Sequence, residues 1–271
     1  MAPSDDNSRT STYWSRPHLV EALLDAVAAS GIDLGTATPD ALAPLDQFHG
    51  GSKEATRTLA RQAEIAAGMR VLDVGGGLGG PARMLAVEYG ARVTVLDLTA
   101  DYLRAGALLT VRMGLARQVH FCRGNALALP FPDGSFDLVW TQNSGMRIAD
   151  KARLYRGFFR VLRPAGRLAQ LEPVAGPVQP PHFPLMWASE PTDSHLVSAE
   201  ALREAMTATG FSERYWNPAV SFPEPTASAA DTSITIQRLI MGERLTAIRE
   251  AGARNAAEGR LHSVLAVFER P

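Results

Sequence analysis

Cysteine is almost absent from this chain of 271 residues, with Cys122 as its single representative. One cysteine excludes an internal disulfide and argues against a metal site built on cysteines, and we expect no metal. The sequence has no run of about 18 apolar residues, so no membrane-spanning helix is expected. The polar start at residues 1–11 lacks the apolar core of a signal peptide, and we therefore expect a cytoplasmic protein.

An excess of either charge is also missing. The chain has 27 basic and 28 acidic residues, for a formal net charge of -1. Because a protein that binds nucleic acid needs a basic surface to neutralise phosphates, nucleic acid is not expected as a partner. Apolar residues make up 46% and charged residues 20%, which is typical of a globular protein with a sizeable core. The length fits one α/β domain with a helical extension.

Short apolar runs alternate with helical patterns along most of the chain. Strands are expected at 70–74, 92–96, 118–122, 136–140, 166–171, 211–216 and 261–268, and helices at 17–30, 52–67, 79–89, 99–113, 150–162 and 198–209. Such alternation predicts a parallel sheet covered by helices on both faces. Residues 32–51 and 173–195 are expected to be loops, and residues 218–258 a loop followed by a helix.

A glycine-rich loop, VLDVGGGLGG at 71–80, stands where the first strand meets a helix. Glycine has no Cβ, so a ligand can lie against the backbone there, and the helix start offers unpaired N–H groups. The spacing of Gly75, Gly77 and Gly80 also satisfies the dinucleotide fingerprint. Taken alone, the loop indicates one of two nucleoside cofactors, or a tight turn without a ligand.

Three polar residues help to distinguish the cofactors. Asp73 precedes the first glycine by two positions, where a carboxylate would favour the ammonium and sulfonium of S-adenosylmethionine and repel a pyrophosphate. Asp97 ends the second strand and could accept both ribose hydroxyls, or be an ordinary loop carboxylate. Asn125 follows the third strand and could accept from the adenine amine, or be a turn residue.

Together with GNALALPFPDGSFDLVW at 124–140 and LRPAGRL at 162–168, these residues resemble the successive motifs of class I S-adenosylmethionine-dependent methyltransferases. The resemblance is closest to the group related to ubiquinone/menaquinone-pathway, sarcosine/dimethylglycine and natural-product methyltransferases. It implies an α/β, Rossmann-like sheet of seven strands in the order 3-2-1-4-5-7-6, with strand 7 antiparallel and helices on both faces. We expect an N-terminal helical lid at 1–51 and the cofactor domain at 52–271, with insertions at 173–195 and 218–258.

The resemblance also implies a set of contacts with S-adenosylmethionine and with its product S-adenosylhomocysteine. They are Gln47, Asp73, Gly75, Gly77, Gly79, Asp97, Leu98, Asn125, Ala126 and Gln142. Two of the chain's departures from the family bear on the site. Asn125 stands where Asp is usual, and Asn143 stands near the expected methyl group where close relatives often carry His. Asn143 is therefore a candidate catalytic residue, and a histidine-based mechanism at that position is in doubt.

The acceptor should bind outside the carboxyl ends of the strands. His49, in a segment that resembles the family's lid, could be a base, a partner for the substrate, or a residue at the start of a helix without a chemical role. His182 lies in the apolar loop 179–187, which could form a wall of the pocket or simply pack on the core. An oxygen or carbon acceptor needs a base, for which His49, His182 and Glu172 are candidates. Trp187 or the pair at 13–14 could face an amine through cation–π attraction.

The sequence thus predicts methyl transfer to nitrogen, oxygen or carbon of a small molecule, such as a secondary metabolite or an amine. A protein of this fold that binds the cofactor but catalyses a cyclisation, or only binds it, is an alternative. A nicotinamide oxidoreductase is disfavoured by Asp73 and by the lack of a recognisable hydride-transfer site. A homodimer is left open, and neither a membrane nor nucleic acid is expected as a partner.

Overall fold

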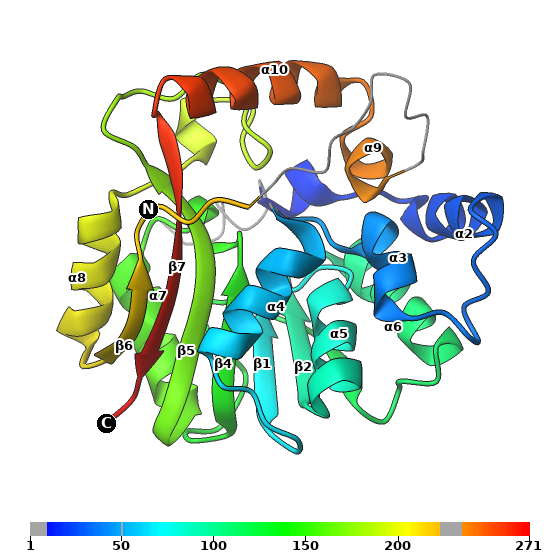
Figure 1. Ribbon diagram of the computed structural model, residues 1–271, viewed down its shortest axis with the longest axis horizontal. Helices are drawn as coiled ribbons and strands as arrows, with labels where there is room; N and C mark the ends of the chain where they lie inside the picture. Colours follow the sequence, from blue (N-terminus) through cyan, green and yellow to red (C-terminus); the bar gives the residue numbers. More distant parts are fainter. Residues whose placement is uncertain (1–9, 50, 223–234) are drawn as a thin grey trace.

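The fold is built on a seven-stranded sheet in the order β3-β2-β1-β4-β5-β7-β6 (Figure 1). It is seen in a computed structural model that describes residues 10–49, 51–222 and 235–271. The strands are β1 (Arg70–Val74), β2 (Arg92–Asp97), β3 (Val119–Arg123), β4 (Phe136–Gln142), β5 (Leu162–Ala175), β6 (Ser212–Asn217) and β7 (Leu261–Glu269). Strands β1 to β5 pair in parallel, and β7 runs antiparallel to both β5 and β6. The predicted strand order and the predicted antiparallel strand are confirmed.

Helices cover both faces of the sheet, as predicted. Side chains of a strand point alternately to opposite faces, so Leu72 and Val74 of β1 belong to one core and Val71 to the other. The first core also contains residues of α7 (Lys151–Val161) and α8 (Ala199–Thr209). The second contains residues of α4 (Ser52–Gln62), α5 (Gly80–Tyr89) and α6 (Ala100–Arg112).

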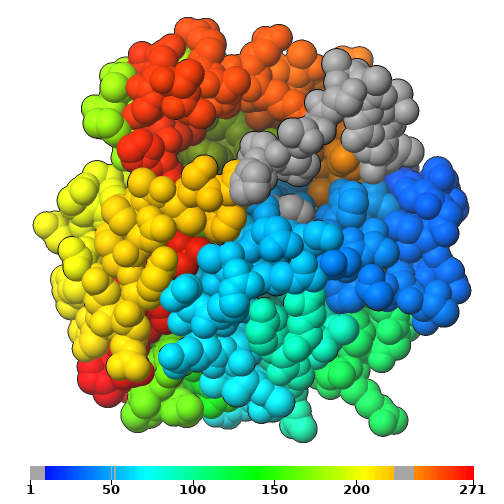
Figure 2. Space-filling model, viewed as in Figure 1, coloured from blue at the N-terminus to red at the C-terminus, as the bar shows by residue number. Residues whose placement is uncertain are grey.

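A third layer of helices lies over the carboxyl ends of the parallel strands (Figure 1). It is formed by α2 (Leu19–Ala29), α3 (Pro39–Asp46), α9 (Ile236–Met241) and α10 (Arg244–Ala257), which share a core with α6. We call these four helices the cap. Figure 2 shows the orange-to-red surface of α9 and α10 along one end of the molecule, with the blue surface of α2 and α3 beside it. Segments from both halves of the chain therefore enclose the edge where ligands bind in such folds.

Two loop predictions were wrong. Residues 32–51 contain helix α3, which begins after Thr38, whose Oγ1 accepts a hydrogen bond from the Ala41 N–H at 3.3 Å. Pro39 at the first helical position needs no N–H partner, so this start follows ordinary capping rules despite the two prolines. The described part of residues 218–258 holds two helices rather than one, separated by Gly242 at a positive φ of 53°. Residues 223–234 lie outside the described residues.

Two short 3₁₀ helices, η1 (Gly145–Arg147) and η2 (Pro191–Asp193), lie in the segments that follow β4 and β5. Strand β5 is longer than predicted because it pairs with β7 as far as Ala175. Within the three described ranges, no helix combines the length and the apolar character that crossing a membrane requires.

A buried ion pair joins the cap to the helices on the sheet. The Arg83 guanidinium in α5 donates to Asp46 Oδ2, at 2.8 Å from Nη2 and 3.3 Å from Nε. Its Nη1 also donates to the Gly106 carbonyl and to Thr110 Oγ1 on α6, at 3.2 and 2.9 Å. The exposed fractions of the two paired side chains are 0% and 1%. The pair therefore connects α3, α5 and α6 at a position that is closed to bulk solvent.

Removing one partner of this pair should be strongly destabilising. We expect Asp46→Ala to lower the free energy of unfolding by about 3–5 kcal/mol, because the Arg83 charge would be left buried without its counter-ion. Urea denaturation of the ligand-free protein measures this. Asp133→Ala breaks the exposed pair with Arg160, in which the aspartate side chain is 77% exposed, and should cost less than about 1 kcal/mol. Equal losses in the two variants would contradict this account.

Candidate active site

The glycine loop follows β1 and brings three glycines into the left-handed conformation. The φ angles of Gly75, Gly77 and Gly79 are 72°, 53° and 73°, a region that favours glycine. A Cβ at Gly75 would lie 2.4 Å from Ser144 Cβ, and one at Gly79 would lie 2.8 Å from the Phe121 ring. The missing Cβ atoms at these two positions therefore allow close packing within the protein. At Gly77 the nearest atom would be 3.6 Å away, so this residue has the most room of the three.

Asp97 lies at the end of β2, between the glycine loop and α6. Its Oδ2 accepts from the Gly77 N–H at 3.0 Å and its Oδ1 from the Thr99 N–H at 2.8 Å. Burial raises the pKa of Asp97, while these backbone donors act to lower it. Each carboxylate oxygen retains a further lone pair. The geometry is compatible with the expected bonds to two ribose hydroxyls, which stay a prediction.

Asp73 is a buried carboxyl with an unsatisfied oxygen. The residue is 2% exposed, and its Oδ2 has no hydrogen-bond partner among the described residues. Burial, together with the nearby charge of Asp97, raises the pKa of Asp73 to about 8. A buried polar atom without a partner is rare and calls for an explanation such as an absent ligand. A cation beside Asp73 would satisfy this oxygen and favour the ionised form.

The residues expected around the adenine lie at the edge formed by β2 and β3. The Asn125 side-chain oxygen accepts from the Leu127 N–H at 2.8 Å, which is the turn geometry allowed for in the sequence analysis. A carbonyl oxygen can accept a second hydrogen bond, so the adenine contact stays a prediction. The Leu98 carbonyl accepts from Arg123 Nε at 3.2 Å. Ala126 packs, partly buried, against the core on the α7 face.

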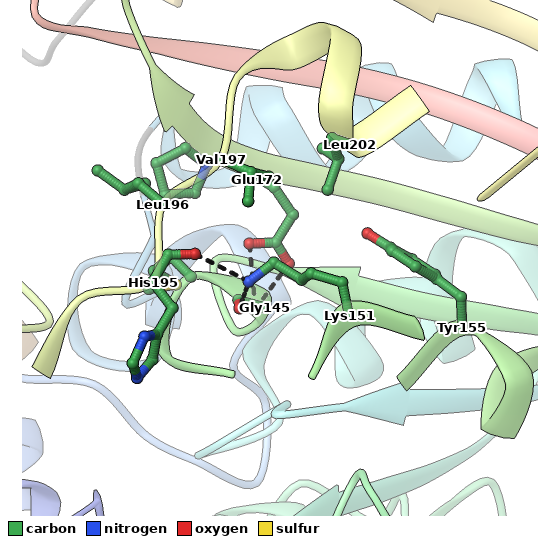
Figure 3. Close-up of a pocket in the computed structure, with 10 residues that line it drawn as sticks. Gly145, Lys151, Tyr155, Glu172, His195, Leu196, Val197 and Leu202 are labelled. Atoms are coloured by element: carbon green, nitrogen blue, oxygen red, sulfur yellow. Dashed lines mark hydrogen bonds between the residues drawn. The ribbon is translucent and has the colours of Figure 1, made fainter. Parts of the chain in front are cut away.

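The segment after β4 is held by a buried carboxylate and a partly buried lysine (Figure 3). Glu172 on β5 accepts from the Ser144 and Gly145 N–H groups, at 3.3 and 3.0 Å, and from Thr141 Oγ1 at 3.2 Å. Lys151 Nζ donates to the carbonyls of Gly145, Ile148 and His195, at 2.8, 2.6 and 3.0 Å. Glu172, a candidate base on sequence grounds, thus anchors the backbone of this segment.

The Glu172 carboxyl is buried, and the Lys151 ammonium near it is partly buried. Burial raises the pKa of Glu172, and burial lowers the pKa of Lys151 to about 8, although each charge favours ionisation of the other. Asn143, in the anchored segment, has a positive φ of 54°, and its N–H donates to the Leu171 carbonyl at 2.9 Å. Asn143 directly follows β4, and both its expected closeness to the methyl group and its catalytic role stay predictions.

The N-terminal segment and the loop after β5 meet in the structure. The Tyr13 hydroxyl donates to the Met186 carbonyl at 3.1 Å, and Trp14 packs against the Phe48 ring edge-to-face at 5.7 Å. The Tyr13 ring is already occupied by cations of the protein, because the guanidiniums of Arg147 and Arg244 lie 4.8 and 5.0 Å from its centroid. The expected cation–π contact of Tyr13 with a substrate amine therefore has a competitor.

His182 lies against α10 of the cap. Its Nε2 lies 2.9 Å from Glu258, and its backbone N–H donates to the Asn255 side chain at 2.7 Å. The Asn255 amide in turn donates to the His182 carbonyl at 2.9 Å. These bonds show that His182 joins the loop 179–187 to α10, and its proposed role in catalysis is not tested by them.

Gln47, His49 and Gln142 are brought together by a residue that the sequence analysis missed. Thr56 Oγ1 in α4 lies 3.1 Å from Gln47 Oε1, 3.2 Å from His49 Nε2 and 3.2 Å from Gln142 Oε1. No motif marks Thr56, whose importance comes from its burial, with an exposed fraction of 0%.

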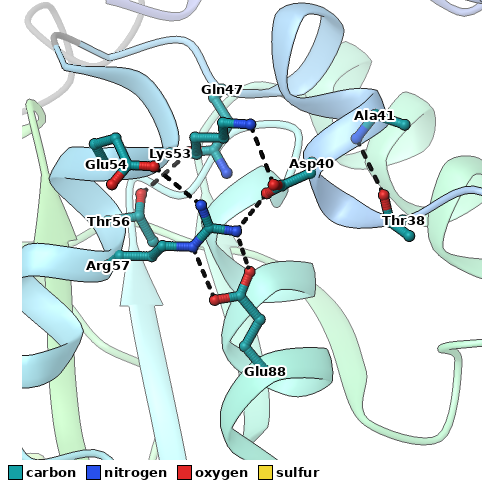
Figure 4. A network of polar contacts seen from close by, with 9 residues as sticks. All are labelled: Thr38, Asp40, Ala41, Gln47, Lys53, Glu54, Thr56, Arg57 and Glu88. Atoms are coloured by element: carbon teal, nitrogen blue, oxygen red, sulfur yellow. Dashed lines mark hydrogen bonds and ion pairs between the residues drawn. The ribbon is translucent and has the colours of Figure 1, made fainter.

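An ion-pair network around Arg57 fixes the position of α4 (Figure 4). Its guanidinium pairs with Asp40 on α3 and with Glu88 on α5. Because Arg57 follows Thr56 directly, these pairs place the Thr56 hydroxyl between the cap and the sheet. In the described parts of the chain, no group of three His, Cys, Asp or Glu side chains is arranged to hold a metal ion.

The raised pKa of Asp73 predicts a pH-dependent stability. An aspartate in the unfolded chain loses its proton near pH 4, whereas the folded protein keeps this proton until about pH 8. The stability that this group contributes is therefore complete below about pH 4 and is lost as the pH rises through about 8. Asp73→Asn has no proton to lose. The free energy of unfolding of Asp73→Asn minus that of the wild type should therefore increase, on the order of a few kcal/mol, between pH 5 and pH 9.

Denaturation of the ligand-free proteins at both pH values measures this difference. Asp133→Asn, which alters an exposed carboxylate, serves as the control and should show no such growth. If the two proteins differ in their free energy of unfolding by the same amount at both pH values, the raised pKa of Asp73 is contradicted.

Comparison with known proteins agrees with this geometry. A family model described as a methyltransferase domain matches residues 72–170. The glycine/sarcosine/dimethylglycine N-methyltransferase of Actinopolyspora halophila is 33% identical over 132 residues. This alignment covers 49% of the chain and 23% of that protein, so the chain spans about a quarter of the length of this relative.

Solved structures resemble the chain over its whole length. The geranyl diphosphate C-methyltransferase from Streptomyces coelicolor A3(2), solved with S-adenosyl-L-homocysteine, gives a TM-score of 0.71 at 19% identity, with 100% of both chains covered. The [4+2]-cyclase SpnF gives a TM-score of 0.67 at 22% identity, covering 98% of this chain and 97% of the other. At these identities the likeness shows the fold.

The matched domain contains the glycine loop and the three polar positions at the ends of β1, β2 and β3. The strand order is the one implied by the sequence motifs. On these grounds residues 72–170 contain a methyltransferase domain, and the chain is similar to class I S-adenosylmethionine-dependent methyltransferases.

Proposed function

We propose that the protein transfers the methyl group of S-adenosylmethionine to a nitrogen, oxygen or carbon atom of a small-molecule acceptor. The observation that carries this proposal is the buried Asp73 carboxyl, whose Oδ2 lacks a partner among the described residues. It lies beside the glycine loop at the edge of the sheet that the cap covers. An ammonium group such as that of the cofactor would satisfy it.

The expected contacts follow the order of the strands. Asn125, Asp97 and Asp73 stand at or just after the ends of β3, β2 and β1, which are neighbours in the sheet. In this arrangement Asn125 receives the adenine, Asp97 the ribose hydroxyls and Asp73 the ammonium of the amino-acid end. These three residues would hold the cofactor at the ends of three adjacent strands, next to the glycine loop.

When bound, S-adenosylmethionine supplies a methyl carbon already activated by the sulfonium. The protein then needs to align the acceptor and to exclude water. The cap and the loop containing Met186 and Trp187 are suited to exclude water, because Trp187 is buried there and Trp14 and Phe48 pack, partly buried, against the same clusters. We propose that residues 1–51 act as the lid of the site.

The acceptor determines whether a base is needed. A neutral amine already presents a lone pair, whereas an oxygen or carbon acceptor needs a proton removed. His49 and His182 are the proposed bases for this step, and Asn143 is a proposed catalytic residue that does not itself take the proton. That the A. halophila relative is named for glycine, sarcosine and dimethylglycine supports an amine acceptor, and the geranyl diphosphate enzyme of similar fold supports a carbon acceptor.

The second candidate function is a cyclisation without methyl transfer. The full-length likeness to the [4+2]-cyclase SpnF favours it, and at 22% identity this likeness concerns the fold. Both candidates require the cofactor-binding geometry around Asp73 and Asp97, so binding alone does not separate them.

Cofactor binding can be tested by calorimetry with S-adenosylhomocysteine and NAD. We expect S-adenosylhomocysteine to bind and NAD not to bind. Asp97→Ala should weaken binding about tenfold or more, because each hydrogen bond to a charged group contributes about 1.5–3 kcal/mol. Asp133→Ala, in an exposed pair, is the control and should bind as the wild type does. An unchanged dissociation constant in Asp97→Ala would show that Asp97 does not bind the ribose.

Methyl transfer can be tested with cofactor labelled in its methyl group and a panel of amines, phenols and prenylated compounds. The proposal predicts that the label appears in one class of acceptor and that S-adenosylhomocysteine accumulates. If a compound is instead consumed in the presence of cofactor while the label stays on the cofactor, the cyclisation is correct and the methyl-transfer proposal is wrong.

A further inference from the structure

Three arginine residues converge on Tyr13 beneath the cap. The guanidiniums of Arg147 and Arg244 lie 4.8 and 5.0 Å from the centroid of its ring. Arg16 Nη1 donates to the Tyr13 carbonyl at 3.1 Å. Burial raises the pKa of the Tyr13 hydroxyl, and the charges that act against this rise are those of the same three arginines. We call Arg16, Arg147 and Arg244 the arginine group.

The arginine group is assembled from separate parts of the chain. Arg16 follows the helical segment at 10–14, Arg147 ends η1 after β4, and Arg244 begins α10 of the cap. Because Arg147 and Arg244 lie near the same ring centroid, their charges are within about 10 Å of each other, where like charges still repel at moderate salt. An anion bound among these charges would relieve the repulsion.

Arg16 and Arg244 form no ion pair in the described parts of the chain. The Arg16 side chain donates to backbone carbonyls, and Arg244 donates to a methionine sulfur at 3.8 Å. Asp101 accepts from the Ser15 hydroxyl and the Arg16 N–H, at 2.9 and 2.8 Å. The same carboxylate is paired with the Arg104 guanidinium. The Arg244 guanidinium, which has five N–H groups, is therefore able to bind an anionic ligand.

Arg147 is the buried member of the arginine group, with an exposed fraction of 6%. Its guanidinium donates to the Trp187 carbonyl and, at 3.4 Å, to the Thr10 hydroxyl. These bonds hold its charge at the Tyr13 ring. Arg244, by contrast, has an exposed side chain. The group thus combines a buried cation in a fixed place with a second cation that a ligand can reach from solvent.

A row of aromatic rings joins the arginine group to the glycine loop. Trp14 packs edge-to-face on Tyr13, at 4.8 Å between ring centroids, and lies 6.4 Å from the Tyr102 ring. A Cβ at Gly77 would lie 3.6 Å from Tyr102. Aromatic rings favour contact with an apolar or aromatic molecule. A small molecule that packs along this row, with one end at the glycine loop, therefore has its other end at the arginine group.

We propose that the methyl acceptor carries a carboxylate or phosphate group, and that Arg147 and Arg244 bind this group beside Tyr13. This inference rests on the proposed function, because it concerns the acceptor of the same reaction. It narrows that acceptor to a molecule with an apolar body and an acidic group. The planar guanidinium presents paired N–H donors that match both anions. Because the Tyr13 ring already faces two cations of the protein, an anion suits this position better than an amine.

Small anions test this subsite in the protein saturated with S-adenosylhomocysteine, which keeps them out of the cofactor site. Calorimetry should show that benzoate or phenyl phosphate binds about tenfold or more tightly than benzamide, which has the same ring but no charge. Tighter binding of phenyl phosphate than of benzoate would identify the acidic group as a phosphate. The reverse order would identify it as a carboxylate.

Substitutions of the arginines should weaken only the charged probes. Arg244→Gln and Arg147→Gln should each weaken the tighter anion about tenfold and change the affinity for benzamide less than about twofold. The matched control is Arg249→Gln, an exposed arginine farther along α10 that bonds to Gln237 at 3.4 Å. It should bind all three probes as the wild type does. Thermal denaturation checks that each variant folds. If the buried Arg147→Gln does not fold, Arg244→Glu, a charge reversal at an exposed position, should abolish anion binding.

Three results would overturn the subsite. They are the absence of binding by both anions, equal affinities of the anions and benzamide, and the same affinity for anions in Arg244→Gln as in Arg249→Gln. Failure of S-adenosylhomocysteine to bind the wild type would instead refute the proposed function.

Discussion

The ion pair between Asp46 and Arg83 is the contact on which the geometry of the site depends. It lies in a completely buried position and connects the last residue of α3 with α5 and α6. The close approach of α3 to α5 requires glycine at position 80, because a Cβ there would lie 2.4 Å from the Asp46 carbonyl oxygen. Gln47 and His49 come one and three residues after Asp46 in the chain. The Asp46–Arg83 ion pair therefore holds both side chains where they reach Thr56. The cap is thereby attached to the sheet next to the glycine loop.

Polar atoms without protein partners gather at this same edge. The described residues include four such atoms there: Asp73 Oδ2, Tyr102 OH, Gln47 Nε2 and Gln142 Nε2. Tyr102 packs beside Gly77, and burial raises the pKa of its hydroxyl. Each unsatisfied buried group destabilises the folded chain, so their concentration in one place is a general mark of a binding site. These atoms differ in the charge that they favour in a ligand. The Asp73 oxygen suits a cationic group, and the amide NH₂ groups of Gln47 and Gln142 suit an anionic one.

The central strands of the sheet are matched by a known protein family, whereas the cap helices are not part of that match. The family match covers residues 72–170, which include most of β1, all of β2 to β4 and most of β5. The cap helices α2, α3, α9 and α10 lie outside the matched residues. This division agrees with a shared chemistry of the cofactor and an acceptor specificity that belongs to the cap. The loop through Met186 and Trp187, which contacts Tyr13 and Trp14, belongs to this second part.

The sequence alone determined the alternation of strands and helices, the glycine loop and the polar residues that end β1 and β2, because these depend on local periodicity and on motif spacing. The order of the strands came from the resemblance of these motifs to a known family. Helix α3 was missed although its signal, Thr38 followed by Pro39, is local as well. Only the tertiary structure decided which polar groups are buried together. Thr56 meets Gln142 across 86 positions of the chain, and His182 meets its partner Glu258, just after α10, across 76 positions. Hydrogen-bond partners of this kind are set by packing, which no local pattern of residues records.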